Sequence, residues 1–238
     1  MRRDFSVRSG EAELMDAMDT PYEVFRDCLT DLGRVNRLTL AHRPTLAYLE
    51  TLRGLGAFDQ DRPVGILDIG SGGGDLLRRI SDWAARRGVA VALTGLDLNP
   101  WSARAASEAW RGGPEPRWVT GDVFDHPCAA DVIVTSLVTH HLTDAEIVRL
   151  LARMEAEARV GWFVNDLHRH PLAFHGFSVL AAVMRWHPFV RHDGPVSIAR
   201  AFTVEDWRRY RSLAGLDPHE ARIARRFPFR ICVSREPK

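Results

Sequence analysis

The sequence has little cysteine, no excess of either charge and no uninterrupted apolar run, and each shortage excludes a class of protein. Its three cysteines, Cys28, Cys128 and Cys232, are few and far apart, which disfavours a disulfide framework and a cysteine zinc site. The 32 basic and 31 acidic side chains nearly cancel, so no extended positive surface for nucleic acid is predicted. We therefore expect no nucleic-acid partner.

Long hydrophobic stretches are missing as well. Residues 1–19 have two arginines directly after Met1, but acidic residues rather than an apolar segment follow them, so no secretory signal is predicted and we expect a cytoplasmic protein. The most apolar stretch, 171–190, is interrupted by His175, Arg185 and Pro188. A membrane span needs a longer unbroken run, so no stable membrane insertion is predicted.

What the sequence does contain is enough apolar material for one substantial core, since 45% of its 238 residues are hydrophobic. Two helices are predicted early, over 21–33 and 44–54. From Val64 onward, short apolar runs alternate with amphipathic segments, which is typical of βα units around a parallel sheet. We expect an N-terminal helical cap over 1–60 and an α/β domain over 61–238.

The pattern of the α/β domain predicts seven strands. Five of them alternate with helices, and they cover residues 64–70, 91–97, 117–120, 131–137 and 161–167. The helices between them are predicted over 75–87, 100–110 and from a capping box of Thr143 and Glu146. The segment 168–201 departs from the alternation and is predicted to be a lid or substrate-binding insertion. A helix from Thr203 and a terminal antiparallel hairpin over 220–234 complete the chain.

The stretch Ile66–Asp75, ILDIGSGGGD, runs from an apolar strand into a glycine turn and then a helix. Such a turn exposes backbone N–H groups at a helix N-terminus, where a polar or negatively charged ligand is favoured. A dinucleotide fingerprint needs a third glycine where Asp75 stands, and the Gly-Lys-Ser/Thr ending of a Walker loop is absent. Both phosphate-binding interpretations are weakened.

The same stretch matches the pattern D-x-G-x-G-x-G through Asp68, Gly70, Gly72 and Gly74. Here the sequence resembles the class I S-adenosylmethionine-dependent methyltransferases, in order and spacing over about 64–167. The resemblance implies a Rossmann-like methyltransferase fold with a mostly parallel seven-stranded sheet. It also implies S-adenosylmethionine as cofactor, S-adenosylhomocysteine as product, and a role for Asp68 at the charged methionyl end.

Two further elements follow in the order of that family. Asp97 ends the second predicted strand, where a carboxylate can accept hydrogen bonds from both ribose hydroxyls. Dinucleotide-binding folds also keep an acid at this place, so the position alone does not distinguish the two cofactors. The resemblance places Asp122 on the adenine amino group and Val123 beside the adenine ring. It adds Leu98 and Ser136 to the predicted cofactor-binding residues.

Seven of the ten histidines fall between residues 140 and 192, at and beyond the strand ends where open α/β sheets bind ligands. His140 and His141 resemble a His-His-Leu stretch common in small-molecule methyltransferases, and we expect His140 to face the ligand. Asp166 and His168 are two residues apart, which predicts a carboxylate–imidazole pair on one side of the chain. The predicted catalytic residues are therefore His140, Asp166 and His168, with a purely structural role open for each histidine.

The histidine cluster raises a metal alternative, since imidazole binds several transition metals. The metal-dependent catechol branch of the family has acids after the fourth and fifth strands. In this sequence the fourth strand ends in Thr135, Ser136 and Leu137, and Asn165–Asp166 has the order reversed. We therefore predict no metal. The N-P-P-Y stretch of exocyclic-amine methylation is absent as well, so a small-molecule acceptor is preferred.

The N-terminal helical cap and the 168–201 insertion are predicted to cover the site with an apolar, aromatic surface. The side chains expected there are Asn36, Arg37, Arg43, Phe174, Phe177, Met184, Trp186 and Phe189. From Asp166 to Thr203 the sequence resembles O-methyltransferases of phenolic or quinone-like polyketides and, more loosely, quinone-biosynthesis methyltransferases. The resemblance implies O-methylation of an aromatic natural product of secondary metabolism. N- or C-methylation, a dinucleotide-dependent reductase and a non-catalytic adenosine-ligand module remain alternatives.

Overall fold

A seven-stranded sheet in the order β3-β2-β1-β4-β5-β7-β6 forms the centre of the molecule. The structure is a computed structural model that describes residues 4–16, 20–58, 61–111 and 113–237; residues 1–3, 17–19 and 59–60 of the predicted cap lie outside the described residues. The strands are β1 (Val64–Ile69), β2 (Val91–Asp97), β3 (Arg117–Thr120), β4 (Ala130–Ser136), β5 (Ala158–Leu167), β6 (Ala221–Arg226) and β7 (Arg230–Arg235).

The first five strands are parallel, and β7 pairs antiparallel with both β5 and β6. The predicted mostly parallel sheet with a terminal hairpin is therefore confirmed. The central strand β4 is buried along nearly its whole length, as expected for a strand covered on both faces. Strand β5 begins at Ala158 rather than at the predicted Gly161, because Ala158 pairs with Ala130 across a register shift.

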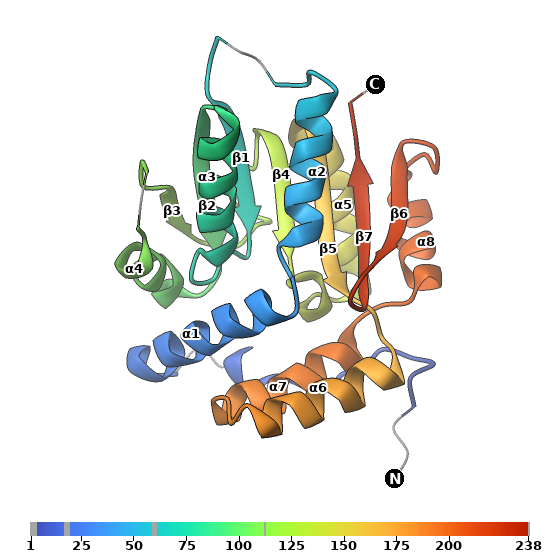
Figure 1. Cartoon of the computed structure of the whole chain (residues 1–238). Helices are drawn as coiled ribbons and strands as arrows, with labels where there is room; N and C mark the ends of the chain where they lie inside the picture. Colours follow the sequence, from blue (N-terminus) through green and yellow to red (C-terminus); the bar gives the residue numbers. More distant parts are fainter. Residues whose placement is uncertain (1–3, 17–19, 59–60, 112, 238) are drawn as a thin grey trace.

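Helices cover both faces of the sheet (Figure 1). They are α1 (Tyr22–Leu38), α2 (Arg43–Gly54), α3 (Asp75–Arg87), α4 (Pro100–Ala109), α5 (Asp144–Glu157), α6 (Pro171–Val183), α7 (Pro188–Arg200) and α8 (Val204–Leu213), with short 3-10 turns η1 (Leu14–Asp16) and η2 (Thr139–His141). The predicted capping box of Thr143 and Glu146 is present at α5. The prediction that the first helix ends at Gly33 is wrong. A glycine inside a helix costs only about 1 kcal/mol, and Val35, two residues further on, packs into a buried cluster.

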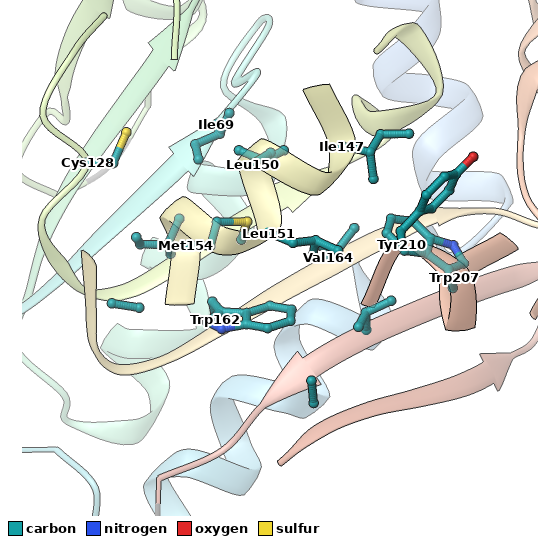
Figure 2. Packing of buried hydrophobic residues seen from close by; sticks show 14 of the residues in the cluster. Ile69, Cys128, Ile147, Leu150, Leu151, Met154, Trp162, Val164, Trp207 and Tyr210 are labelled. Carbon is teal, nitrogen blue, oxygen red and sulfur yellow. The ribbon is translucent and has the colours of Figure 1, made fainter. Parts of the chain in front are cut away.

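Two apolar cores lie on opposite faces of the sheet. Figure 2 shows the first, in which Met154 and Leu151 of α5 pack near Trp162 of β5, with Trp207 and Tyr210 of α8 at the other end. In the second core, Leu49 and Leu52 of α2 pack with residues of α3 and β1. Helix α2 is therefore part of the layered domain, and the expected boundary near residue 60 falls inside a shared core.

The predicted insertion 168–201 is a pair of helices, α6 and α7, that lies with α1 across the carboxyl ends of the parallel strands (Figure 1). A small cluster of its own joins these three helices, through Cys28 and Val35 of α1, Ala181 of α6, and Val190 of α7. The described residues include no helix with both the length and the apolar composition needed to cross a membrane.

Candidate active site

A cavity of about 690 Å³ lies where the carboxyl ends of the strands meet the covering helices. Its wall includes the glycine turn after β1, the chain after β2 and β4, and side chains from α1 and α7. Parallel strands of an open α/β sheet bind their ligands at this edge. The cavity is therefore where sequence and fold both lead us to expect the site.

The glycine turn has a backbone that only glycine adopts readily. Gly70, Gly72 and Gly74 all have positive φ, at 73°, 49° and 71°. A side chain at Gly70 would also collide with Val138, and one at Gly74 with Trp118. Gly70 and Gly72 line the cavity, whereas Gly74 does not and is the N-cap residue of α3.

Two predicted aspartates are held in place by the backbone around them. Asp97 accepts hydrogen bonds from the N–H of Gly72 at 2.7 Å and of Asn99 at 2.9 Å. Asp122 accepts one from the N–H of Phe124 at 2.8 Å. A carboxylate oxygen can accept more than one hydrogen bond, so both aspartates can still accept hydrogen bonds from a ligand. Both aspartates line the cavity, together with the other predicted residues Asp68, Leu98, Val123 and Ser136.

A second pair of acidic residues makes the region near the turn electronegative. Asp68 is 2% exposed, and burial, together with the charges of Asp75 and Asp97, raises its pKa well above the usual value. Burial also acts to raise the pKa of Asp75, but His42 and Asn36 outweigh it and lower that pKa to about 2. His42 Nε2 and Asn36 Nδ2 both lie 2.9 Å from Asp75 Oδ2. Sequence reasoning missed Asp75 and His42, although Asp75 stands in the quoted motif.

His140 and Asp166 form a buried pair at the wall of the cavity. His140 Nδ1 lies 2.7 Å from Asp166 Oδ1, and the two side chains are 3% and 0% exposed. Asp166 Oδ2 accepts hydrogen bonds from the Thr139 hydroxyl and from the His140 N–H at 3.1 Å. Burial would raise the pKa of Asp166, yet His140 and these hydrogen bonds hold it below its usual range. An aspartate so held fixes the imidazole with Nε2 turned away from it.

The predicted pairing of Asp166 with His168 is wrong. Strand β5 ends at Leu167, and His168 forms an isolated bridge with Phe202 instead of continuing the strand. Its ring lies 5.5 Å from that of His170 and does not line the cavity. The prediction relied on side chains two residues apart facing the same way, which holds only inside a strand. The partner of Asp166 is instead His140 of η2.

Comparison with known proteins identifies the domain. Residues 66–161 match the family model described as a methyltransferase domain. No protein with a curated description matches the sequence. Human N-acetylserotonin methyltransferase, solved with S-adenosylmethionine, aligns with a TM-score of 0.62 and 17% identity, over 98% of this chain and 61% of that chain.

Two further solved structures are similar in fold. The plantazolicin methyltransferase BpumL, with S-adenosylhomocysteine bound, aligns with a TM-score of 0.58 and 16% identity over 92% of this chain and 86% of that chain. Magnesium protoporphyrin IX methyltransferase from Synechocystis PCC 6803, also with S-adenosylhomocysteine, gives a TM-score of 0.53 and 17% identity over 84% of each chain. Residues 66–161 form a methyltransferase domain. The enzyme is a methyltransferase that uses S-adenosylmethionine, as the sequence predicts.

The residues of the methyltransferase domain fit this cofactor. S-adenosylmethionine carries a sulfonium and an ammonium, and the cavity next to the glycine turn is lined by the carboxyl groups of Asp68, Asp75 and Asp97. Among the described residues, the Asp68 carboxyl group has no hydrogen-bond or ion-pair partner, and burial together with the negative charges of Asp75 and Asp97 raises its pKa. A positive group bound there would relieve that repulsion.

A second carboxyl group faces His140 from the N-terminal segment. Glu13 is 7% exposed, and its carboxylate oxygens lie 3.7 Å from His140 Nε2 and 3.8 Å from His141 Nε2. Burial raises the pKa of Glu13 to about 7, against the charges of His141 and Arg200. These three side chains have the spacing of a candidate metal group, so our prediction of no metal needs a direct test. Glu13 carried no sequence pattern that singled it out.

Most of the aromatic side chains that were predicted to cover the site do not line the cavity. Of the aromatic and methionine side chains named for it, Phe177 lines the cavity, while Trp186 is buried in the cluster between α1, α6 and α7. Phe174 contacts Phe5, and Met184 is exposed. Asn36 lines the cavity, but Arg37 and Arg43 do not. Helices α6 and α7 pack on each other and on α1 through part of their apolar side chains. Leu172, Val179 and Val183 of α6 are exposed instead.

Proposed function

We propose that the enzyme methylates a hydroxyl oxygen of a small acceptor that is mainly apolar, most simply a phenolic or quinone-like natural product, with His140 as general base. His140, which lines the cavity and is paired with the buried Asp166, carries this proposal. Bound S-adenosylmethionine supplies an already activated methyl group, so the protein has to align the acceptor and remove its proton.

We assign the cofactor to the half of the cavity that follows β1, β2 and β3. In this arrangement Asp97 accepts hydrogen bonds from the ribose hydroxyls. Asp122 and Val123 hold the adenine, and Asp68 faces the methionyl ammonium. Leu98 also lines this half, and Ser136, the last residue of β4, lies between the two halves. The acceptor then occupies the other half, toward β4, β5 and α7, where His140 lies.

The proton path follows from the hydrogen bonding of His140. Asp166 only accepts hydrogen bonds when ionised, so His140 Nδ1–H donates to it and Nε2 has a free lone pair. Nε2 takes the proton of the acceptor hydroxyl as the oxygen attacks the methyl group, and Asp166 stabilises the imidazolium that forms. His168 has no role in this scheme.

The lining of the acceptor half supports an apolar substrate. It includes Phe177 of α6, Val190 and Ile198 of α7, and Leu32 and Val35 of α1. The similar structures include enzymes named for N-acetylserotonin, for a magnesium porphyrin and for the peptide plantazolicin. Because these named substrates differ from one another, we infer the acceptor from the lining of the cavity and not from the similar structures.

An assay with methyl-labelled S-adenosylmethionine tests the proposal. Matched sets of phenols, anilines and activated carbon acids with the same apolar substituents are offered, and the methylated atom is located in the product. We expect label on oxygen. Label on nitrogen or carbon would favour the alternative chemistries, and tight S-adenosylhomocysteine binding without transfer to any acceptor would favour a non-catalytic module.

A further inference from the structure

Arg230 is a buried cation whose hydrogen-bonding groups are mostly unused. It opens strand β7, is 3% exposed and lines the cavity. Its Nη2 donates to the Thr39 hydroxyl at 3.2 Å. Its Nε and Nη1 have no hydrogen-bond partner among the residues that the structure describes.

The charge of Arg230 also lacks a carboxylate partner in the described part of the chain. The nearby acid, Asp166, directs its oxygens to Thr139, His140 and the Leu167 N–H. Burial lowers the pKa of Arg230 to about 10, so the guanidinium is still protonated at neutral pH. A buried charge without a partner is strongly unfavourable, and here an anion entering the cavity is the group that would satisfy it.

The position of Arg230 separates it from the cofactor residues. It pairs in register with Leu167, the last residue of β5, and three strand spacings, roughly 14 Å, separate β7 from β1. The aspartates assigned to the cofactor follow β1, β2 and β3. Arg230 is therefore on the acceptor side of His140.

We propose that Arg230 binds a carboxylate of the acceptor, so that the substrate is an aromatic hydroxy acid. A planar carboxylate accepts two N–H bonds from a guanidinium, a match that a neutral carbonyl or hydroxyl does not offer. The bond to Thr39 holds the guanidinium in position. This inference rests on the proposed function only for the hydroxyl end of the substrate.

Calorimetry on the enzyme loaded with S-adenosylhomocysteine tests the inference without turnover. The probes are a series of alkyl-substituted hydroxybenzoates and their methyl esters, which differ only in the negative charge. We expect each acid to bind wild-type protein at least about tenfold more tightly than its ester. Arg230→Met should abolish that preference and Arg230→Lys should reduce it, while S-adenosylhomocysteine affinity is unchanged.

The matched control is Arg226→Met. Arg226 faces Arg230 in the β6–β7 register but is exposed, so its loss should leave the preference for the acid intact. Equal binding of acid and ester to wild-type protein, or binding of neither, overturns the inference, and this comparison needs no variant. Loss of S-adenosylhomocysteine binding in folded Arg230→Lys would assign the guanidinium to the cofactor and likewise overturn it.

The outcomes also separate this inference from the proposed function. An acid that binds through Arg230 but is never methylated on oxygen would support the carboxylate site and contradict the proposed function. Methylation of neutral phenols as efficiently as of acids, with no effect of Arg230→Met, would support O-methylation and contradict the carboxylate site.

Discussion

His140 and His141 are adjacent in the chain, and the two rings have different partners. His140 Nδ1 faces Asp166 inside the molecule, whereas His141 Nδ1 lies 2.8 Å from Asp16 near the surface. Both Nε2 atoms approach Glu13. Of these two histidines, only His140 combines burial, a buried carboxylate partner and a position on the cavity wall, so we propose His140 as the general base.

Replacing His140 with glutamine should lower kcat by about 10²- to 10⁴-fold, because the proton acceptor is lost. The affinity for S-adenosylhomocysteine should stay the same, as no cofactor residue changes. His168→Gln is the matched control, since His168 does not line the cavity, and it should retain wild-type turnover. A His140→Gln enzyme with normal kcat on a phenolic substrate would refute the base assignment.

Glu13 should make the stability of the protein fall as the pH rises. Its pKa is raised from 4.5 to about 7 in the folded state, so the folded protein binds the extra proton and loses that advantage between these pH values. The free energy of unfolding should decrease across this window by up to about 3 kcal/mol. Urea titrations of wild-type and Glu13→Gln protein between pH 4.5 and 7.5 measure the effect. The variant should show a smaller decrease, and parallel curves would contradict the shift.

The Glu13, His140 and His141 cluster also gives a test of the no-metal prediction. Arg200 lies 3.8 Å from a Glu13 carboxylate oxygen and 2.9 Å from Asp16, so a cation already balances these acids. Dialysis against a chelator should therefore leave turnover and S-adenosylhomocysteine affinity unchanged. Loss of activity that a divalent cation restores would instead make this cluster a metal site.

At the scale of elements, the glycine turn joins β1 to α3 through a backbone that the neighbouring chain restricts. Gly70 N donates to the carbonyl of Leu96, and the Val138 side chain occupies the space where a Cβ would stand. The turn after β4 therefore packs directly on the turn after β1. The backbone conformation of the glycine turn therefore depends on the position of the turn after β4 as well.

Gly70→Ala should reduce both stability and cofactor binding. Gly70 and Gly88 have similar positive φ values, 73° and 67°, but Gly88 has open space where its Cβ would lie. Gly88→Ala should thus lose only about 1 to 2 kcal/mol from backbone strain, with S-adenosylhomocysteine affinity intact. Gly70→Ala should lose more stability and at least about tenfold in affinity. Equal effects in thermal unfolding and calorimetry would contradict the contact with Val138.

Local sequence was sufficient to predict elements whose signals lie within a few residues. Strand β3 and helix α3 match their predicted bounds, because apolar alternation and a glycine end mark them locally. The His140–Asp166 pair was not predicted, since it joins the turn η2 to the end of strand β5, 26 residues further along the chain, through the register of β4 and β5. Arg230 and Glu13 were missed for the same reason, since only the folded chain brings strand β7 and the N-terminal segment to the cavity.

At the scale of the whole molecule, the cavity exists because three helices lie across one edge of the sheet. Leu29 of α1 contacts the glycine turn, within 3.6 Å of where the Gly72 Cβ would stand, and α7 reaches the acceptor half through Val190. The covering helices share a core of their own. The cavity is therefore covered by a unit that packs as a group over the strand ends.

The most direct measurement is calorimetric titration of S-adenosylhomocysteine and of NAD into wild-type and Asp97→Asn protein. Wild-type protein should bind S-adenosylhomocysteine and not NAD. Asp97→Asn should keep the thermal unfolding temperature and weaken S-adenosylhomocysteine binding about 10- to 100-fold, because two ribose hydrogen bonds to a charged acceptor are lost or weakened. Tight NAD binding, or unchanged affinity in the folded variant, would contradict the placement of the adenosine beside the glycine turn.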